Sequence, residues 1–411
     1  MAERFQAPRG TADVLPAEAA ARWRIEQTAR ELLERAGYAR IETPVFEDTE
    51  LFARGVGGST DIVRKEMFTF EDKGGRSITL RPEATASIAR AYLEHGMQKL
   101  PQPVKLWWYG QLFRHERPQA GRFRQFTQLD AEVIGSDSPL VDAELILLCH
   151  ELLRSLEVPE LTLRIGSLGS PEARAEYRQG LIAYLRQREG KLARDVRDRI
   201  DENPLRAFDS KDPSTQAVMA EAPTMLDRLE GEDAEHFAAV RRLLDRAGIE
   251  YELDGALVRG LDYYTRTVFE FHCARLGPQS QVAGGGRYDR LIELLGGPPT
   301  PANGWAAGIE RIVLAIGSGG EEPRHDVFVA AEESQRERAL ALVTELRRAG
   351  LRADLDLAGR GMKGQMRQAD RAGARHALIL DSGGSLRLRD MRSGEQRQVS
   401  PERLVEELGA R

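Results

Sequence analysis

Apolar residues recur along the chain at two different spacings, and each spacing predicts a different kind of element. Residues 22–37 carry apolar side chains at the spacing of one helical face, and Gly37 is placed to end that helix. Residues 138–157 predict a second amphipathic helix, and residues 161–169 predict a strand. The pattern therefore indicates a protein built from both helices and strands.

Residues 105–135 predict two strands joined by an arginine-rich loop. The first arm, Leu106 to Phe113, is aromatic and apolar, whereas the second, Gln125 to Ile134, partly alternates between polar and apolar residues. Pro118 and Gly121 lie between the arms and are residues that turn a chain. The basic residues of this hairpin are Arg114, His115, Arg117, Arg122 and Arg124. Guanidinium groups bind phosphate oxygens, so the loop either binds an anion or forms a solvated basic rim.

One face of the second arm is polar. Gln128, Asp130 and Glu132 follow the strand period of two, so their side chains share one face beside the basic loop. A surface that places acidic and basic groups side by side would suit a zwitterionic ligand.

Two segments before the hairpin carry further signals. Pro44 interrupts a strand-like segment, which should therefore lie at the edge of a sheet or in an interface. Residues 77–96 predict a strand that runs into a helix, with Glu83 at the junction. Glu83 and Thr85 could simply cap this helix, because acidic and hydroxyl side chains are favoured at helix N-termini, or they could form part of a binding site.

The sequence pattern changes in the middle of the chain. From about Ser170 to Gly248, charged residues recur with helical spacing, which predicts a helical insertion. Residues 252–273 return to β-type sequence with an unusual density of polar side chains. The stretch that follows, AGGGRYDRLIELLGG, predicts a tight turn and lacks the GKS or GKT of a phosphate-binding loop.

The C-terminal part of the chain predicts a separate domain. Residues 305–317 predict a buried helix, in which Arg311 needs an anionic partner. The segment Gly317 to Arg324 has the composition of a linker. Residues 325–411 alternate strand and helix signals, which predicts a small α/β domain with a largely parallel sheet.

Composition narrows the class of protein. The chain has 411 residues, enough for two or three domains at roughly 150 residues each. No apolar run approaches the ~20 residues of a membrane-spanning helix, and the N-terminus lacks a signal-peptide core. Two cysteines without metal-ligand spacing fit a reducing cytoplasm. A net charge of −6 argues against nonspecific coating of nucleic acid but leaves room for a local basic cleft and an RNA substrate.

Five motifs, in their order along the chain, closely resemble the histidyl-tRNA synthetase family of class II aminoacyl-tRNA synthetases: RPEAT, FRHERP…GRFRQF, LVRGLDYYTRTVFEF, AGGGRYD and AAGIER. The resemblance runs from Pro8 to the C-terminal domain. It implies an α+β catalytic core, an antiparallel sheet flanked by helices, in residues 1–169 and 249–318. It also implies a helical insertion at 170–248 and an α/β anticodon-binding domain at 325–411.

The resemblance assigns roles by position. It implies that Arg114 and Arg259 are catalytic and hold the α-phosphate of ATP, with Mg²⁺ bridging phosphate oxygens. Arg122, Phe126 and Arg311 would complete the ATP site, with Phe126 stacked on adenine. The residues implied to bind L-histidine are Glu83, Ala84, Thr85, Arg114, Gln128, Glu132, Arg259, Tyr263 and Tyr264. Which residues ligate magnesium stays open.

The same resemblance implies partners and rivals. The loop from Arg117 to Gly121 would face the acceptor end of tRNA(His), the C-terminal domain would face the anticodon, and the Pro44 segment would form a two-fold homodimer. One rival is the inactive paralogue that serves as regulatory subunit of ATP phosphoribosyltransferase. Another is a synthetase-like RNA-binding protein without aminoacylation. The first typically lacks the C-terminal domain that this chain keeps, and the second would be expected to lose Glu83, Arg259 or Tyr264.

Overall fold

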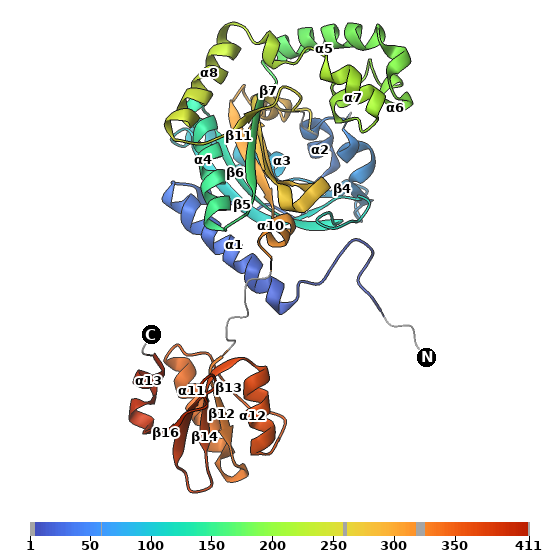
Figure 1. The fold of residues 1–411 in the computed structure, drawn as a ribbon. Helices are drawn as coiled ribbons and strands as arrows, with labels where there is room; N and C mark the ends of the chain where they lie inside the picture. The colour runs from blue at the N-terminus through green and yellow to red at the C-terminus, as the bar shows by residue number, and fades with distance from the viewer. Residues whose placement is uncertain (1–4, 59, 258–260, 318–324, 410–411) are drawn as a thin grey trace. The chain divides into compact units, whose positions relative to one another are not determined.

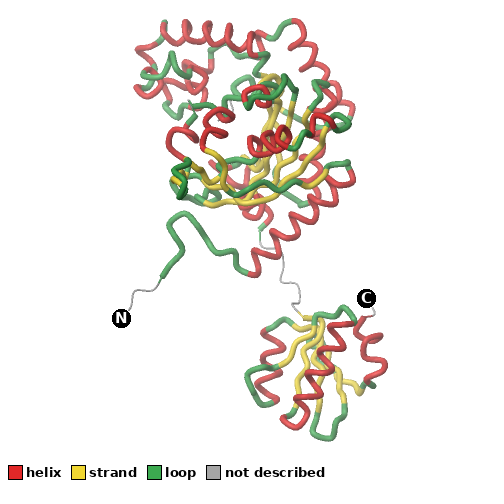
Figure 2. The backbone as a smooth tube through the Cα atoms, turned by 180° about the vertical axis from the view of Figure 1, so that it is seen from behind, coloured by secondary structure: helices red, strands yellow, loops and turns green. Residues whose placement is uncertain are grey.

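The computed structural model describes residues 5–58, 60–257, 261–317 and 325–409. The chain divides into two compact units, Met1–Gly319 and Gly320–Arg411, and each unit is treated by itself. Figure 1 shows a large sheet in the first unit and a small one in the second, and Figure 2 shows both from behind. Among the described residues, no helix is long and apolar enough to cross a membrane.

The first unit is built around an eight-stranded sheet with the order β1-β5-β6-β11-β10-β9-β7-β8. Its middle strands run antiparallel to their neighbours and are β5 (Val104–Phe113), β6 (Gln125–Ile134), β11 (Ala302–Gly308), β10 (Gln281–Arg287), β9 (Thr265–Cys273) and β7 (Leu161–Ser167). The edge strands β1 (Ala39–Arg40) and β8 (Glu252–Leu253) pair parallel to β5 and β7. The expected antiparallel core is confirmed, with parallel pairing at its two edges.

Helices cover both faces of this sheet, because successive strand residues point to opposite sides. Leu129, Ala131 and Val133 of β6 belong to the core on one face. That core also contains residues of α1 (Pro16–Arg35), α4 (Pro139–Ser155), α8 (Gly231–Arg246) and α10 (Ile309–Ile316). The core on the opposite face, which carries the polar residues of β6, contains residues of α3 (Thr85–Glu94) and α9 (Leu291–Leu294). Helix α2 (Thr49–Val56) packs against α3 on this side (Figure 1).

Smaller elements complete the first unit. A three-stranded sheet contains β2 (Phe46–Asp48), β4 (Ser77–Leu80) and β3 (Phe68–Glu71), and a π-helical turn at Ile62–Glu66 directly precedes β3. Pro44 lies between β1 and β2, which are both edge strands, as its position predicted. Helices α5 (Pro171–Arg186), α6 (Arg194–Arg197) and α7 (Pro213–Ala220) share a hydrophobic cluster of their own. Single 3₁₀ turns lie at Met97–Lys99, Glu189–Lys191, Pro204–Asp209, Leu226–Arg228 and Ala274–Gln279.

The second unit contains a five-stranded sheet with the order β13-β12-β14-β15-β16. Its strands are β12 (His325–Ala331), β13 (Ala353–Leu355), β14 (Ala374–Leu380), β15 (Leu386–Asp390) and β16 (Gln396–Gln398). Its helices are α11 (Arg336–Arg348), α12 (Met362–Arg371) and α13 (Pro401–Gly409). Only β12 pairs in parallel, with β13 and β14, whereas the last three strands are antiparallel. The prediction of a largely parallel sheet was therefore wrong, because it overlooked β15 and β16, two short strands of sequence LRLRD and QRQ.

Two predicted elements of the first unit also differ. The glycine-rich stretch predicted as a tight turn is strand β10, and the first residues of the predicted buried helix belong to β11. A Cβ on Gly285 would lie 2.0 Å from the carbonyl oxygen of Gly304, so glycine is needed where the two strands meet. The predicted linker, residues 318–324 above all, lies outside the described residues.

Candidate active site

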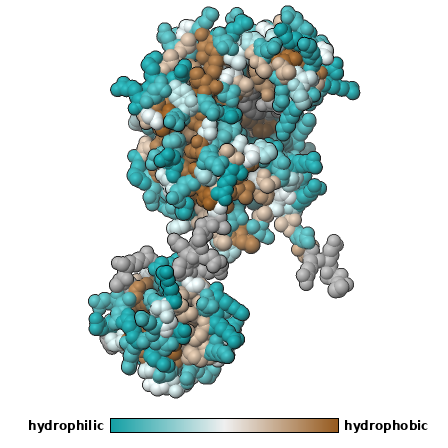
Figure 3. All heavy atoms as spheres, in the orientation of Figure 1, coloured by the Kyte–Doolittle hydropathy of each residue, from teal (hydrophilic) through white to brown (hydrophobic). Residues whose placement is uncertain are grey.

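A cavity of about 680 Å³ opens on the polar face of the main sheet. Figure 3 shows the surface of the first unit hollowed at this place. The cavity is lined by strands β6, β9, β10 and β11, by the start of α3 and by the loop of the arginine hairpin. Most residues predicted to bind substrate line it, namely Glu83, Thr85, Arg114, Arg122, Phe126, Gln128, Tyr263, Tyr264 and Arg311.

Three other predicted residues are placed differently. Ala84 is fully buried at the N-cap of α3, where it packs with the core rather than facing the cavity. Glu132 lies directly behind the wall and bonds to two residues that line the cavity. Arg259 lies outside the described residues, so its predicted role stays a prediction from sequence.

Glu132 is held by two hydroxyl groups. Its carboxyl accepts hydrogen bonds from Thr85 Oγ1 at 2.8 Å and from Tyr288 Oη at 2.5 Å. A Cβ on Gly304 would lie 1.6 Å from Glu132 Oε2, so the glycine leaves the space that this carboxyl fills. Burial raises the pKa of Glu132 to about 8, against the lowering effect of the two hydroxyl donors. Sequence reasoning missed Tyr288; its only signal was its place in the AGGGRYD motif.

Glu83 serves both the helix and the cavity. Its Oε1 accepts a hydrogen bond from the backbone N–H of Ala86 at 2.8 Å, which caps the first turn of α3. Its Oε2 accepts a bond of 3.4 Å from Tyr263 Oη inside the cavity. Burial raises the pKa of Glu83 even though the Ala86 N–H and Arg114 oppose the shift. The capping and binding interpretations of Glu83 are therefore compatible.

Aromatic rings close the same end of the cavity. The ring centroids of Tyr263 and Tyr264 are 4.8 Å apart, and those of Tyr263 and Tyr288 are 5.6 Å apart. All three tyrosines are buried. They surround the carboxyls with an apolar wall whose hydroxyl groups can still form hydrogen bonds.

The opposite end of the cavity is basic. The guanidinium carbon of Arg114 lies 5.2 Å from the ring centroid of Phe126, and its Nε donates to the carbonyl oxygen of Pro82 at 2.8 Å. Arg122 forms an ion pair of 2.6 Å with Glu116. The pKa of Arg311 is lowered by burial and then by the charge of Arg122. These arginines therefore form a concentration of positive charge next to the partly buried ring of Phe126, which suits a nucleotide phosphate and base.

Among the described residues, Arg311 forms no ion pair with the anionic partner that its sequence context predicted. Its Nε donates to the carbonyl oxygen of Gly121 at 3.1 Å, and its Nη1 donates to that of Gln281 at 2.7 Å. Its neighbour Glu310 instead pairs with Arg22 at 3.0 Å and accepts a bond from Thr127 N–H. The hydrogen bonds of Arg311 thus hold it in place between neutral oxygens and leave its charge to attract an anion.

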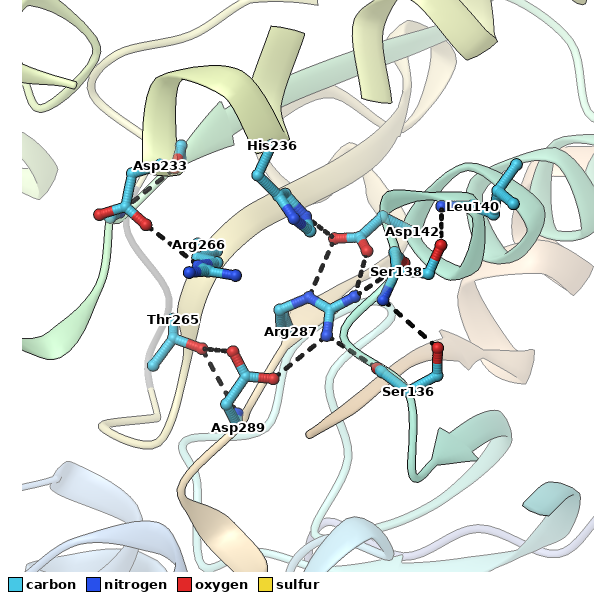
Figure 4. Close-up of polar contacts among 12 residues, drawn as sticks. Ser136, Ser138, Leu140, Asp142, Asp233, His236, Thr265, Arg266, Arg287 and Asp289 are labelled. Carbon is cyan, nitrogen blue, oxygen red and sulfur yellow. Dashed lines mark hydrogen bonds and ion pairs between the residues drawn. The ribbon is translucent and has the colours of Figure 1, made fainter. Parts of the chain in front are cut away.

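A network of buried charges lies behind the carboxyl end of the cavity (Figure 4). Arg287 ends β10, is fully buried and forms a close ion pair with Asp142 of α4. Its guanidinium also donates to Asp289 at 3.2 Å and to the carbonyl oxygens of Ser136 and Ser138 at 3.0 and 3.2 Å. His236 of α8 bonds to Asp142 at 3.3 Å. This network, which sequence reasoning missed, attaches α4 and α8 to the strand that ends next to Tyr288.

A second link attaches the same helix near the cavity. Arg266 follows Tyr264 by two residues and has a left-handed backbone, with φ of 45°. Its Nε donates to Asp233 of α8 at 3.0 Å, and the other oxygen of Asp233 accepts from Ser170 N–H at 2.7 Å. Asp233 thus links α8 both to strand β9, through Arg266, and to the start of the helical segment, through Ser170.

Comparisons with known proteins agree with this geometry. A family model described as histidyl-tRNA synthetase matches residues 10–312, and one described as an anticodon binding domain matches residues 313–411. The histidine–tRNA ligase of Rubrobacter xylanophilus is 50% identical, covering 96% of this chain and 97% of its own. That of Thermosynechococcus vestitus is 46% identical, covering 98% and 96%. The crystal structure of the apo histidyl-tRNA synthetase of S. aureus matches with a TM-score of 0.81 and 36% identity, covering 98% of this chain and all of that one.

Proposed function

The chain belongs to the histidyl-tRNA synthetase family and is a histidine–tRNA ligase, and we propose that the cavity described above is where it joins histidine to ATP. The observation that carries the assignment of the site is the division of one cavity into an acidic, tyrosine-lined end and an arginine-rich end. A zwitterionic amino acid with a polar ring fits the first, and a nucleotide triphosphate fits the second.

We propose that no side chain acts as a base in the first step. The carboxylate of histidine is already ionised at pH 7, so its oxygen attacks the α-phosphorus of ATP directly. A carboxylate–phosphorus bond forms, the bond from that phosphorus to the bridging oxygen breaks, and pyrophosphate leaves. Positioning of the two reactants and neutralisation of the charge that develops are what the protein contributes.

The basic residues would divide this work. Arg114 would bind the α-phosphate from one side and Arg259, by its place in the LVRGLDYY motif, from the other. Arg122 and Arg311 would bind the remaining phosphates, and Phe126 would stack on the adenine. Mg²⁺ requires oxygen ligands and commonly binds through one or two carboxylates together with substrate phosphates. The carboxylates of Glu116 and Glu270 line the cavity and fit that requirement; the ion would neutralise phosphate charge.

The acidic end would select histidine. Glu132, held by Thr85 and Tyr288, would meet the imidazole together with Tyr264, while Glu83 and Gln128 would lie near the α-amino group. A pocket built to form hydrogen bonds with a substrate rejects apolar analogues, because its own buried polar groups would be left without partners.

The second step would transfer the histidyl group from the adenylate to the 3′ end of tRNA(His), with AMP as leaving group. Residues 117–121 would face the acceptor end, and residues 325–411 would bind the anticodon, consistent with the anticodon-binding match over 313–411. We further propose a homodimer formed through the Pro44 segment and a cytoplasmic location. The regulatory-subunit alternative has less support, because the curated ligases match this chain over its full length, including the second unit.

Histidine-dependent exchange of pyrophosphate into ATP by the purified protein tests the proposal. The unsubstituted protein should exchange with L-histidine and not with other amino acids. Arg114→Ala should lower the rate on the order of 10² to 10³-fold, the usual loss when one donor to a transition-state charge is removed. Arg30→Ala, which removes a half-exposed arginine of α1, is the matched control and should leave the rate unchanged. No exchange by the unsubstituted protein would overturn the proposal.

A further inference from the structure

Asp130 occupies the centre of the cavity face of β6 and has no role in the assignments above. Its side chain is 1% exposed and lines the cavity. Among the described residues, no donor forms a hydrogen bond with its buried Oδ1. A buried carboxyl normally has a hydrogen-bonding or charged partner, because removal from water without one is costly. The missing partner is therefore informative.

The two described arginines whose charge acts on Asp130 form their hydrogen bonds with other residues. Arg81 and Arg114 lower the pKa of Asp130, yet burial, Glu132 and Glu83 raise it well above its usual range. Arg81 donates to the carbonyl oxygens of Gln111, Thr43 and Pro44 and stacks on the ring of Trp108. The Nε of Arg114 donates to Pro82. Neither arginine forms a hydrogen bond with Asp130, so its carboxyl faces the cavity without a cationic hydrogen-bond partner among the described residues.

Position along the strand indicates which group of a ligand would lie there. Phe126, Gln128, Asp130 and Glu132 follow one another on the same face of β6, and alternate residues of a strand are about 7 Å apart. Phe126 lies at the arginine-rich end and Glu132 at the tyrosine-lined end. In histidine, the α-carbon with its ammonium group lies between the carboxylate that is activated and the imidazole ring. Asp130 lies between the residues that would receive those two groups.

We propose that Asp130 is a further substrate-binding residue, whose carboxylate accepts a charge-assisted hydrogen bond from the α-ammonium group of the bound amino acid. The inference rests on the proposed function, because the direction of the ligand along β6 comes from it. Glu83 would contact the same ammonium group from the start of α3. Binding would give the Asp130 carboxylate the partner that it lacks in the ligand-free protein, and a charge-assisted bond of this kind is stronger than a neutral one.

The decisive measurement is a comparison of two ligands that differ only in the ammonium group. Isothermal titration should give the dissociation constants of L-histidine and of 3-(imidazol-4-yl)propionate for the unsubstituted protein and for Asp130→Asn. The substitution should weaken histidine by about 10 to 100-fold, the range for losing a hydrogen bond to a charged group. It should change the affinity for the analogue, which has no ammonium group, by less than about twofold.

The outcomes separate this proposal from the function on which it rests. Equal weakening of both ligands, or no weakening of histidine, would overturn the role of Asp130 while leaving the ligase assignment intact. Failure of the unsubstituted protein to bind histidine at all would overturn the proposed function, and with it the direction assumed for the ligand.

A stability measurement on the ligand-free protein excludes a merely structural role. Asp130→Asn replaces a buried carboxyl whose Oδ1 has no hydrogen-bond partner among the described residues, so the urea midpoint of unfolding should stay the same or rise. Asp142→Asn is the matched control, because Asp142 is equally buried but paired with Arg287, and its midpoint should fall. A fall in both variants, or failure of Asp130→Asn to fold, would show that Asp130 supports the fold and would overturn the proposal.

Discussion

Two groups of buried ionisable side chains in the first unit differ in whether they have charged partners. Arg287 and Asp142 are both fully buried, and together with Asp289 and His236 they satisfy one another. Glu83, Asp130 and Glu132 are almost as buried. Glu83 and Asp130 line the cavity, and Glu132 lies directly behind its wall. In the described part of the chain, no buried cation forms a hydrogen bond with any of the three.

The contrast separates charges that have partners inside the protein from carboxyls that we propose bind the ligand. Burial of a charge is favourable only when hydrogen bonds and opposite charges replace the lost water. The Arg287 network meets that condition inside the protein, so its removal should lower the free energy of unfolding. The carboxyls at the cavity meet it only in part. They should therefore lower the stability of the ligand-free protein and gain partners when a substrate binds. Charge alone would not distinguish the two groups.

The largest effect is expected where the paired network is broken. Arg287→Met keeps the bulk of the side chain but leaves Asp142 buried without its main partner. Loss of one member of a buried ion pair costs about 3–5 kcal/mol, so the free energy of unfolding of the first unit should fall by that amount in urea titrations. The double variant Arg287→Met/Asp142→Leu should recover much of the loss. An unchanged free energy in the single variant would contradict the comparison.

A smaller effect, visible as a pH dependence, is expected at Glu132. The pKa of this carboxyl is about 8 in the folded protein and ordinary, about 4.3, in the unfolded chain. Between these values only the folded state holds the proton, so stability is present at low pH and is lost as pH rises through about 8. Glu132→Gln removes this contribution.

The measurement for Glu132 is the difference in unfolding free energy between the ligand-free variant and the unsubstituted protein. The variant should become relatively more stable as pH rises from about 5 to about 8. Glu83 and Asp130, whose pKa values are also raised, remain in both proteins and cancel. If this free-energy difference does not change with pH, the carboxyl of Glu132 has partners in the folded protein that are as good as those of Asp142.

The smallest effect is expected at the edge of the paired network. His236→Leu removes one hydrogen bond to Asp142, which keeps its ion pair with Arg287. The loss should be about 1 kcal/mol, the net value of a single hydrogen bond, in the same urea titrations. Exchange activity of the folded variant should be unchanged, because His236 does not line the cavity. A loss as large as that of Arg287→Met would mean that the network depends on every member equally.

Local patterns were enough to place much of the site. The period of two along residues 125–134 placed Gln128, Asp130 and Glu132 on one face before any neighbouring strand was known. Glu83 was located at a strand-to-helix junction, and the arginine hairpin was delimited at both arms. These features depend on residues close together in the chain, whose geometry follows from backbone periodicity. The roles of individual residues came from the family resemblance, not from periodicity.

Local patterns failed where strands meet their neighbours. The glycines of AGGGRYD favour a turn when considered alone, yet they form β10, because β9 and β11 approach too closely for side chains. Strand β16 was missed because it lies at the edge of its sheet, where polar residues are tolerated, and β15 was missed because it is short and has only two apolar residues.

The sequence by itself determined the family, the kinds of residue in the site and the face of β6 on which the acidic ones lie. Only the tertiary structure decided which charges have partners. Tyr288 reaches Glu132 across 156 residues of sequence, and Arg287 reaches Asp142 across 145. These contacts exist because the strand order β6-β11-β10 brings distant segments together, and spacing along the chain does not encode that order. The lack of a hydrogen-bond partner for Asp130 Oδ1 among the described residues follows for the same reason, because a missing contact can be recognised only from the three-dimensional positions of the neighbouring residues.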